Sequence, residues 1–171
     1  MTIYFILPVE RIASHGVCLR LWLDVLLQVL LRRTTVPRVP TLVVVDEAAQ
    51  IGPCPALKTV ATYLRANGVR LWTFIQDLSQ IQALYPKDWQ TLVNNTSALT
   101  FLPGSSFAAR ELAELAGVSP TAIAQLAENE QLVCEMGQLT RVVRCAQYWK
   151  DRLFEGRFDP IPRYFESPAR R

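Results

Sequence analysis

Histidine is almost missing from this sequence, and its cysteines never occur in closely spaced pairs. His15 is the only histidine, and no CxxC motif links Cys18, Cys54, Cys134 and Cys145. Zinc sites need several such ligands at short spacings, and small secreted folds need paired cysteines. The sequence therefore indicates neither a zinc site nor a disulfide framework, and it fits a reducing cytoplasm best.

Two glycine-rich phosphate-binding motifs are missing as well. No GxxxxGK[ST] is present, so the sequence lacks the backbone cradle and the lysine that hold the β- and γ-phosphates of a nucleotide. No GxGxxG is present to favour a dinucleotide.

Membrane and leader segments are not predicted either. The most apolar stretch, residues 17–31, contains Arg20, Asp24 and Gln28, and it is shorter than the roughly 20 apolar residues that a bilayer core requires. We expect a buried helix there. The N-terminus lacks the basic region and cleavage site of a signal peptide, and the formal charge of +3 is too small by itself to indicate nucleic acid.

What the sequence does contain is an alternation of apolar runs and helical patterns over 171 residues. Strands alternating with helices predict an α/β fold with a mostly parallel sheet. The patterns predict strands at 3–7, 42–45, 69–77 and 98–104, helices at 14–31, 56–67, 78–85, 89–93 and 107–117, a helix or loop at 118–130 that Ser119 caps, and a hairpin around Gly137. Cys134 and Cys145 are expected opposite each other in that hairpin, and the four tryptophans are expected to pack in the core.

The stretch LVVVDEAAQI, residues 42–51, carries the first chemical signal. Four consecutive apolar residues predict a strand that is covered on both faces, and Asp46 and Glu47 follow where it ends. This is the form of a Walker B motif, in which the first carboxylate holds Mg²⁺ through water and the second polarises the attacking water. The alternative is that the acidic pair caps the following helix.

A second signal is Gln76 at the end of the strand LWTFIQD. An amide beside the acidic pair can sense a γ-phosphate or orient water, whereas the plain alternative is a cap on the next helix. Arg65 and Arg70 flank the Gly68 turn. Each could act as an arginine finger on a neighbouring subunit, but for each alone we favour an ordinary surface role.

Together these residues carry a family resemblance. The chain resembles the C-terminal part of TraG/TraD coupling proteins of conjugation and type IV secretion. The resemblance lies in the segment TIYFILPVER, followed by the DEA motif, a proline-punctuated helix, GVRLW, IQDLSQI and a Tyr with a nearby Trp. The similarity covers most of residues 1–160.

The resemblance implies a RecA-like motor with a C-terminal β-hairpin, which uses ATP and Mg²⁺ and works as a homo-hexamer at the cytoplasmic face of the bacterial inner membrane. Such motors link the relaxosome to the type IV secretion channel and pump single-stranded DNA or protein. It assigns Asp46 and Glu47 to Walker B, Gln76 to the next strand's glutamine and Arg65 to the presumed finger. Residues 1–149 would be a motor portion of the type that recognises the relaxosome protein TraM, and residues 150–171 an extended or partly disordered tail.

The sequence departs from this family in lacking the phosphate loop. We therefore expect a truncated coupling protein, a gene fragment or an incomplete reading frame, without appreciable ATPase activity of its own and without a membrane span. Apolar faces are expected to lack partners, with candidates Leu21, Trp22, Leu26, Leu30 and Trp72.

Two other classes of function stay open. A non-enzymatic adaptor could dock a relaxosome protein or a secretion substrate. Basic clusters could bind a DNA backbone: we expect Arg32, Arg33 and Arg38 to form a solvated face, and we leave open whether Arg141, Arg144 and Arg152, with Tyr148 and Trp149, contact DNA. An unrelated receiver-like or Rossmann-like protein also has acidic residues at strand ends, but it does not account for the Gln76 strand together with the Tyr85 and Trp89 segment.

Overall fold

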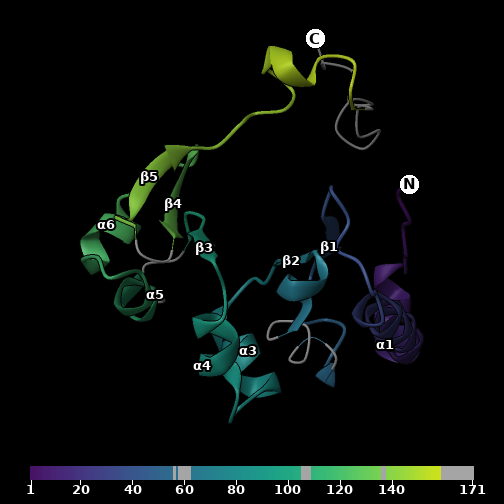
Figure 1. Cartoon of the computed structure of the whole chain (residues 1–171). Helices are drawn as coiled ribbons and strands as arrows, with labels where there is room; N and C mark the ends of the chain where they lie inside the picture. The colour runs from purple at the N-terminus through teal and green to yellow at the C-terminus, as the bar shows by residue number, and fades with distance from the viewer. Residues whose placement is uncertain (56, 58–62, 105–108, 136–137, 159–171) are drawn as a thin grey trace. The chain divides into compact units, whose positions relative to one another are not determined.

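The computed structural model describes residues 1–55, 57, 63–104, 109–135 and 138–158 (Figure 1). The chain divides into two compact units, Met1–Thr96 and Ser97–Arg171, each with its own hydrophobic cluster. The predicted helix at 56–67 and the tip of the predicted hairpin at Gly137 lie largely outside the described residues, as does the tail beyond residue 158.

The first unit begins with one long helix, α1 (Val9–Leu31), directly after Pro8. Proline needs no backbone donor at this position, and Glu10 in the first turn suits the positive end of the helix dipole. The predictions of a strand at 3–7 and of a helix that begins only at residue 14 are therefore wrong. Residues 1–8 form no strand, because the strands of this unit pair only with each other among the residues described.

Two parallel strands, β1 (Thr41–Val45) and β2 (Val69–Thr73), pair in register from Thr41 opposite Val69 to Val45 opposite Thr73. A short 3₁₀ helix, η1 (Leu64–Asn67), precedes β2. Gly68 lies between η1 and β2 with φ of 67°, and a Cβ on it would lie 2.8 Å from the Pro37 ring. Glycine is thus required where the chain turns into β2.

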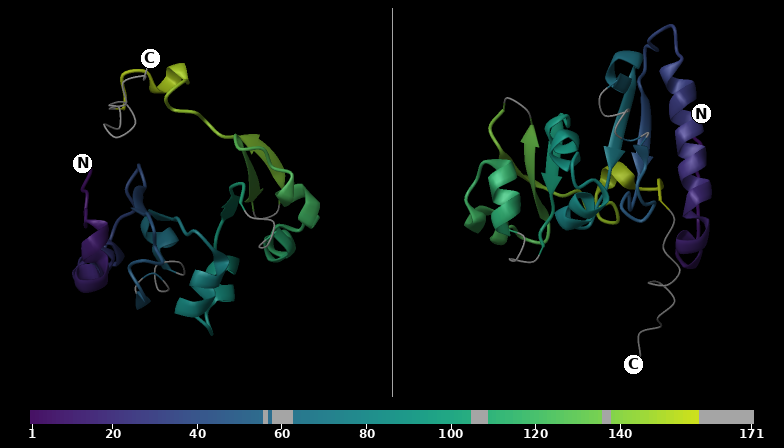
Figure 2. Two further views of the ribbon diagram at one scale, coloured as in Figure 1. Left: turned by 180° about the vertical axis from the view of Figure 1, so that it is seen from behind. Right: turned by 90° about the horizontal axis from the view of Figure 1, so that it is seen from below.

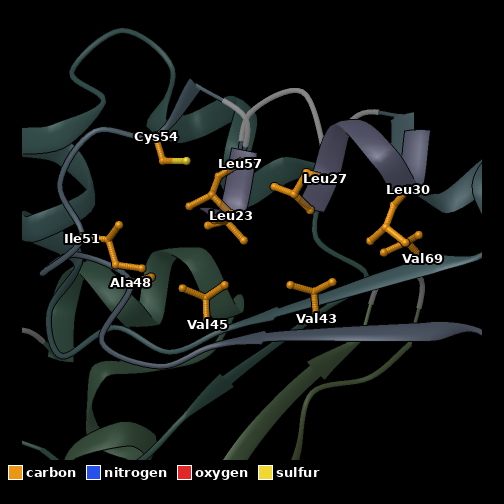
Figure 3. Packing of buried hydrophobic residues seen from close by; sticks show 10 residues of the cluster. All are labelled: Leu23, Leu27, Leu30, Val43, Val45, Ala48, Ile51, Cys54, Leu57 and Val69. Carbon is orange, nitrogen blue, oxygen red and sulfur yellow. The ribbon is translucent and has the colours of Figure 1, made fainter. Parts of the chain in front are cut away.

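The core of this unit lies between α1 and one face of the strands. Leu23, Leu27 and Leu30 point from the helix toward Val43 and Val45 (Figure 3), and α1 runs alongside both strands (Figure 2). These buried helical residues are spaced by four and three, which places them on one helical face.

The opposite face of the strands is uncovered within the described residues. Leu42 and Val44 are exposed, and the exposed ring of Trp72 stacks on Phe74 with centroids 5.4 Å apart. The predicted strand covered on both faces is therefore covered on one. Leu21 and Trp22 are exposed on α1 as expected.

Leu26 and Leu30 were also expected to lack partners, but Leu30 is buried and Leu26 packs partly against the core. The prediction that the tryptophans lie in the core is also wrong for Trp22, Trp72 and Trp149, which are exposed.

The stretch Glu10–Leu31 of α1 is long and apolar enough to cross a membrane by length and composition alone. The core helix of a soluble protein can have the same length and composition. The leucines of α1 that contact the strands give it such a core face.

Two short helices, α3 (Leu78–Leu84) and α4 (Trp89–Asn94), complete the first unit at the places predicted. Leu78 is buried at the start of α3. Both helices follow β2 in the chain, and residues 74–77 connect the strand to α3.

The second unit contains an antiparallel sheet in the order β3 (Ala98–Phe101), β4 (Glu130–Glu135) and β5 (Arg141–Arg144). Its other elements are α5 (Ala109–Ala116), α6 (Pro120–Ala124) and η2 (Arg152–Phe154). Ser119 caps α6 as predicted, by accepting the Ala122 N–H. The C-terminal hairpin is confirmed, since β4 and β5 pair antiparallel.

The register of the hairpin corrects one expectation about the cysteines. Cys134 lies opposite Leu99 of β3, and the backbone N–H of Cys145 donates to the carbonyl of Asn129. In the hairpin, Val133 faces Arg141 and Glu130 faces Arg144. The two thiols are therefore not a cross-strand pair.

Candidate functional site

The site lies where β1 and β2 end. Hydrogen bonding between the two chain segments continues past the strands: the Phe74 N–H donates to the Val45 carbonyl over 3.0 Å, and the Ala48 N–H donates to the Phe74 carbonyl over 2.9 Å. These bonds hold the residues after β1 beside those after β2. Parallel strands carry both sets of side chains to the same edge.

Glu47 and Gln76 meet at this edge. The Gln76 Nε2 group donates to both carboxylate oxygens of Glu47, over 2.8 Å to Oε1 and 2.9 Å to Oε2. Hydrogen bonds to an ionised carboxylate are stronger than neutral ones. The structure thus brings together the glutamine and the second carboxylate that the sequence singled out.

Glu47 has an unusual backbone, with φ of 51°, and it is the one non-glycine residue with positive φ in the described part of the chain. L-residues seldom adopt this left-handed conformation, and such residues gather at functional sites. The conformation turns the chain sharply after β1, so that Asp46 and Glu47 do not continue the strand.

Asp46 is exposed beside it, and its Oδ1 accepts the Glu47 N–H over 3.0 Å. Its other oxygen has no partner within the described residues. Mg²⁺ in nucleotide sites commonly takes one or two carboxylates and completes its shell with waters and phosphates. Asp46 fits such a water-mediated role, while no group of three or more His, Cys, Asp or Glu among the described residues could hold a metal alone.

The plain alternatives, in which these side chains cap helices, do not match the geometry. Asp77 caps α3: its carboxylate accepts the Ser79 N–H over 2.7 Å, and this backbone bond is the main cause that lowers the pKa of Asp77. Gln76 is therefore not the cap. After Asp46 and Glu47 the chain forms turns rather than a helix.

Two residues that the sequence analysis missed anchor the segment after the carboxylates. Arg20 of α1 donates through Nη1 to the Ile51 carbonyl. The Tyr85 hydroxyl accepts a hydrogen bond from the Cys54 N–H over 2.9 Å, and it donates one to the Cys54 carbonyl over 3.3 Å. Arg20 gave a signal as a cation in an apolar helix, while the partners of Tyr85 lie 31 residues away and gave none.

The predicted arginines do not join this edge. Arg70 is an exposed residue near the start of β2, and Arg65 belongs to η1 before it, where its side chain lies outside the described residues. Arg65 lies before β2 and Arg70 is its second residue, so most of the strand separates both from Gln76, which follows its end. In the second unit, Arg144 and Arg152 are exposed, and Arg141 forms an ion pair with Glu135 over 2.8 Å.

A nucleotide does not fit the residues present as well as Mg²⁺ does. Backbone N–H groups of a glycine-rich loop and a lysine normally hold the phosphates, and the sequence contains no such loop. The edge of β1 and β2 offers two carboxylates and an amide, which suit a cation and a water rather than anionic phosphates.

The family model described as the TraM recognition site of TraD and TraG matches residues 40–131. The bacterial conjugative coupling protein TrwBdeltaN70, in its unbound monoclinic form, shares the fold with a TM-score of 0.68 at 21% identity, covering 78% of this chain and 38% of that one. TrwB in complex with ADP and Mg²⁺ gives 0.67 at 22% identity with the same coverage. VirB4 of Thermoanaerobacter pseudethanolicus gives 0.62 at 18% identity, covering 83% and 39%. No curated protein matches the sequence significantly.

The chain thus spans well under half the length of these solved structures. At these low identities the structural matches show a shared fold, and this confirms the α/β, RecA-like class expected from the sequence. The family model covers more than half of the chain, including Asp46, Glu47 and Gln76. The chain therefore belongs to the TraG/TraD family of conjugative coupling proteins.

Proposed function

We propose that this chain supplies the water-activating edge of an ATP-driven coupling motor, which links the relaxosome to the type IV secretion channel and moves single-stranded DNA or protein. The observation that carries the proposal is the pair of hydrogen bonds from Gln76 to the Glu47 carboxylate, with Asp46 adjacent. A strained glutamate, an amide and a second carboxylate at one strand edge match what phosphoryl transfer to water requires.

Each residue has a separate role in this proposal. Asp46 holds Mg²⁺ through water, and the ion would neutralise charge on the phosphates. Glu47 accepts a proton from the attacking water, which is general-base work. Gln76 orients the Glu47 carboxylate and, when it releases that carboxylate, is free to hold the water or sense a γ-phosphate.

The phosphate loop must come from sequence outside this chain. In support, TrwB has been solved with a non-hydrolysable ATP analogue and with ADP and Mg²⁺, while this chain matches 38% of it. The exposed apolar face of β1 and β2, with Leu42, Val44 and Trp72, would then be covered by the remainder of the motor.

The same proposal includes the assembly and the partners. A hexamer at the cytoplasmic face of the inner membrane would let Arg65 or Arg70 reach the nucleotide of a neighbouring subunit, because Arg65 lies in η1 and Arg70 near the start of β2, at the other end of the strand from the carboxylate edge. A TraM-like relaxosome protein is the partner indicated by the description of the family model for residues 40–131.

The test begins with the DNA upstream of the Met1 codon, in the same frame. If it encodes a phosphate loop, the longer chain should hydrolyse ATP with Mg²⁺, and Glu47→Gln should lower kcat by about a hundredfold or more. Glu10→Gln is the matched control, since Glu10 lies on α1. Normal turnover by Glu47→Gln would overturn the site.

The 171-residue chain alone should show no appreciable ATP turnover. Robust Mg²⁺-dependent turnover that Glu47→Gln abolishes would show that no outside phosphate loop is needed. A stop codon and unrelated sequence upstream of Met1 would remove the motor proposal for this protein.

A second function is favoured by the missing phosphate loop itself, together with the family's TraM-recognition description. A non-enzymatic adaptor would bind a TraM-like relaxosome protein with the same affinity whether or not ATP is added. Calorimetric titration with and without ATP separates the two functions, because a motor component should bind its partner in a nucleotide-dependent way once the phosphate loop is present.

A further inference from the structure

Three aromatic side chains form a cluster after β5, which we call the aromatic triad: Tyr148, Trp149 and Phe158. The Tyr148 ring meets Trp149 and Phe158 edge to face, with centroids 5.0 Å apart in each pair and interplanar angles of 89° and 84°. Between them in the chain lies η2, capped by the Asp151 carboxylate, which accepts the Leu153 N–H. Edge-to-face contacts fix the rings relative to one another.

The aromatic triad is on the surface. All three rings are exposed, and the Trp149 side chain is 55% exposed. Leu153 of η2 is exposed as well. Exposed aromatic groups held in fixed orientations are costly to keep in water and offer flat faces on which a planar ligand can stack.

Positive charge accompanies the aromatic triad. Four exposed cations lie near it in the chain, and none of them is in an ion pair within the described residues: Arg144, Lys150, Arg152 and Arg157. Arg141 differs, because its guanidinium is bound to Glu135.

The net positive charge of the chain is concentrated in the same part of the sequence as the aromatic triad. Residues 141–171 carry eight Lys and Arg against four Asp and Glu, whereas residues 1–140 carry ten against eleven. The positive excess of the chain therefore lies entirely in its last part, beyond residues 40–131 that the family model matches.

We propose that the aromatic triad and the four exposed cations form a binding surface for single-stranded nucleic acid. Bases stack on Trp149 and Tyr148, and phosphates pair with Arg144, Arg152 and their neighbours. Stacking needs unpaired bases, because the faces of bases in a duplex are already covered by their neighbours. The inference rests on the proposed function for the identity of its ligand, but the surface requires no bound ATP and does not depend on the role of Glu47.

The test is fluorescence anisotropy of a labelled oligothymidylate with the 171-residue chain, at several salt concentrations. Trp149→Ala should weaken binding by about tenfold. Its matched control is Trp72→Ala, because Trp72 is similarly exposed, at 54%, but lies on β2 outside the aromatic triad, and the variant should bind as the unaltered chain does. Arg152→Gln and Arg144→Gln should each reduce the salt slope by about 0.7, while Arg38→Gln should not.

Equal effects of the two tryptophan substitutions would overturn the proposal, as would a duplex of the same length that binds as tightly as the single strand. Binding to vesicles of anionic lipid, without binding to the oligonucleotide, would also overturn it and would identify a membrane surface as the ligand. Circular dichroism of each variant shows whether the fold is kept.

Discussion

Tyr85 uses one hydroxyl to bind both polar groups of the Cys54 backbone. Cys54 is almost fully buried, so its N–H has no water to replace this partner. We expect Tyr85→Phe to lower the free energy of unfolding by about 1–3 kcal/mol, the cost of an unsatisfied buried donor. Urea denaturation measures the change. Tyr4→Phe, at an exposed tyrosine, is the control and should have no effect.

The same hydroxyl gives a prediction in alkaline solution. Burial raises the pKa of Tyr85 above its ordinary value of 10.0. A raised folded-state pKa contributes stability that is present below pH 10.0 and is lost as the pH rises through the folded value. The advantage of the unaltered chain over Tyr85→Phe should therefore shrink in strongly alkaline buffer. A constant difference across that range would contradict this.

At this scale, the sequence revealed the residues that sit beside apolar runs. Asp46 and Glu47 could be singled out because they directly follow a strand pattern, and Gln76 because it lies at the end of one. Tyr85 and Arg20 could not, because each contacts a backbone group 31 residues away, and no local pattern records such a distance. Nor does any pattern predict the left-handed backbone of Glu47.

Among the elements, α1 carries one packed and one exposed apolar face. Leu27 is 1% exposed and Leu21 is 62% exposed on the same helix. Leu27→Ala should lower the free energy of unfolding by about 2–5 kcal/mol, because it removes buried methyl groups and leaves a cavity. Leu21→Ala, the matched control, should change it by less than about 0.5 kcal/mol. Equal losses would show that the core lies elsewhere.

The start of α3 gives a prediction that depends on acid. Asp77→Ala should lower stability by about 1 kcal/mol at neutral pH, because it removes the acceptor for the Ser79 N–H. That bond lowers the pKa of Asp77, so its contribution is present above the ordinary value of 3.8 and is lost as the pH falls through the folded value. Asp77→Ser keeps an acceptor and should lose less at neutral pH. Chemical denaturation across this pH range measures both.

Local patterns located most elements but not their partners. The apolar runs placed β1, β2 and β3, and Ser119 with Pro120 marked the start of α6. The segment 3–7 looks equally strand-like, yet a strand exists only where another pairs with it, and pairing is a property of the whole sheet. The hairpin register failed for a related reason: the apolar pattern of 131–149 does not specify which residue of one strand faces which residue of the other.

For the whole molecule, uncovered apolar faces predict self-association. Leu21 and Trp22 on α1, and Val44 and Trp72 on the strands, are exposed in the first unit. Sedimentation of the 171-residue chain should show concentration-dependent association. A variant with Leu21→Gln and Trp72→Gln should associate less and keep its circular dichroism spectrum. A monomer at all concentrations would mean that these faces do not attract one another.

The placement of the tryptophans also decides how this protein can be observed. Trp22, Trp72 and Trp149 are all exposed, and each belongs to a different surface: the outer side of α1, the open face of the strands and the aromatic triad. Since most of the indole rings already contact water in the folded state, intrinsic emission should change little on unfolding. It should instead shift to shorter wavelength when a partner covers one of these surfaces, so the chain carries its own optical reporters of docking.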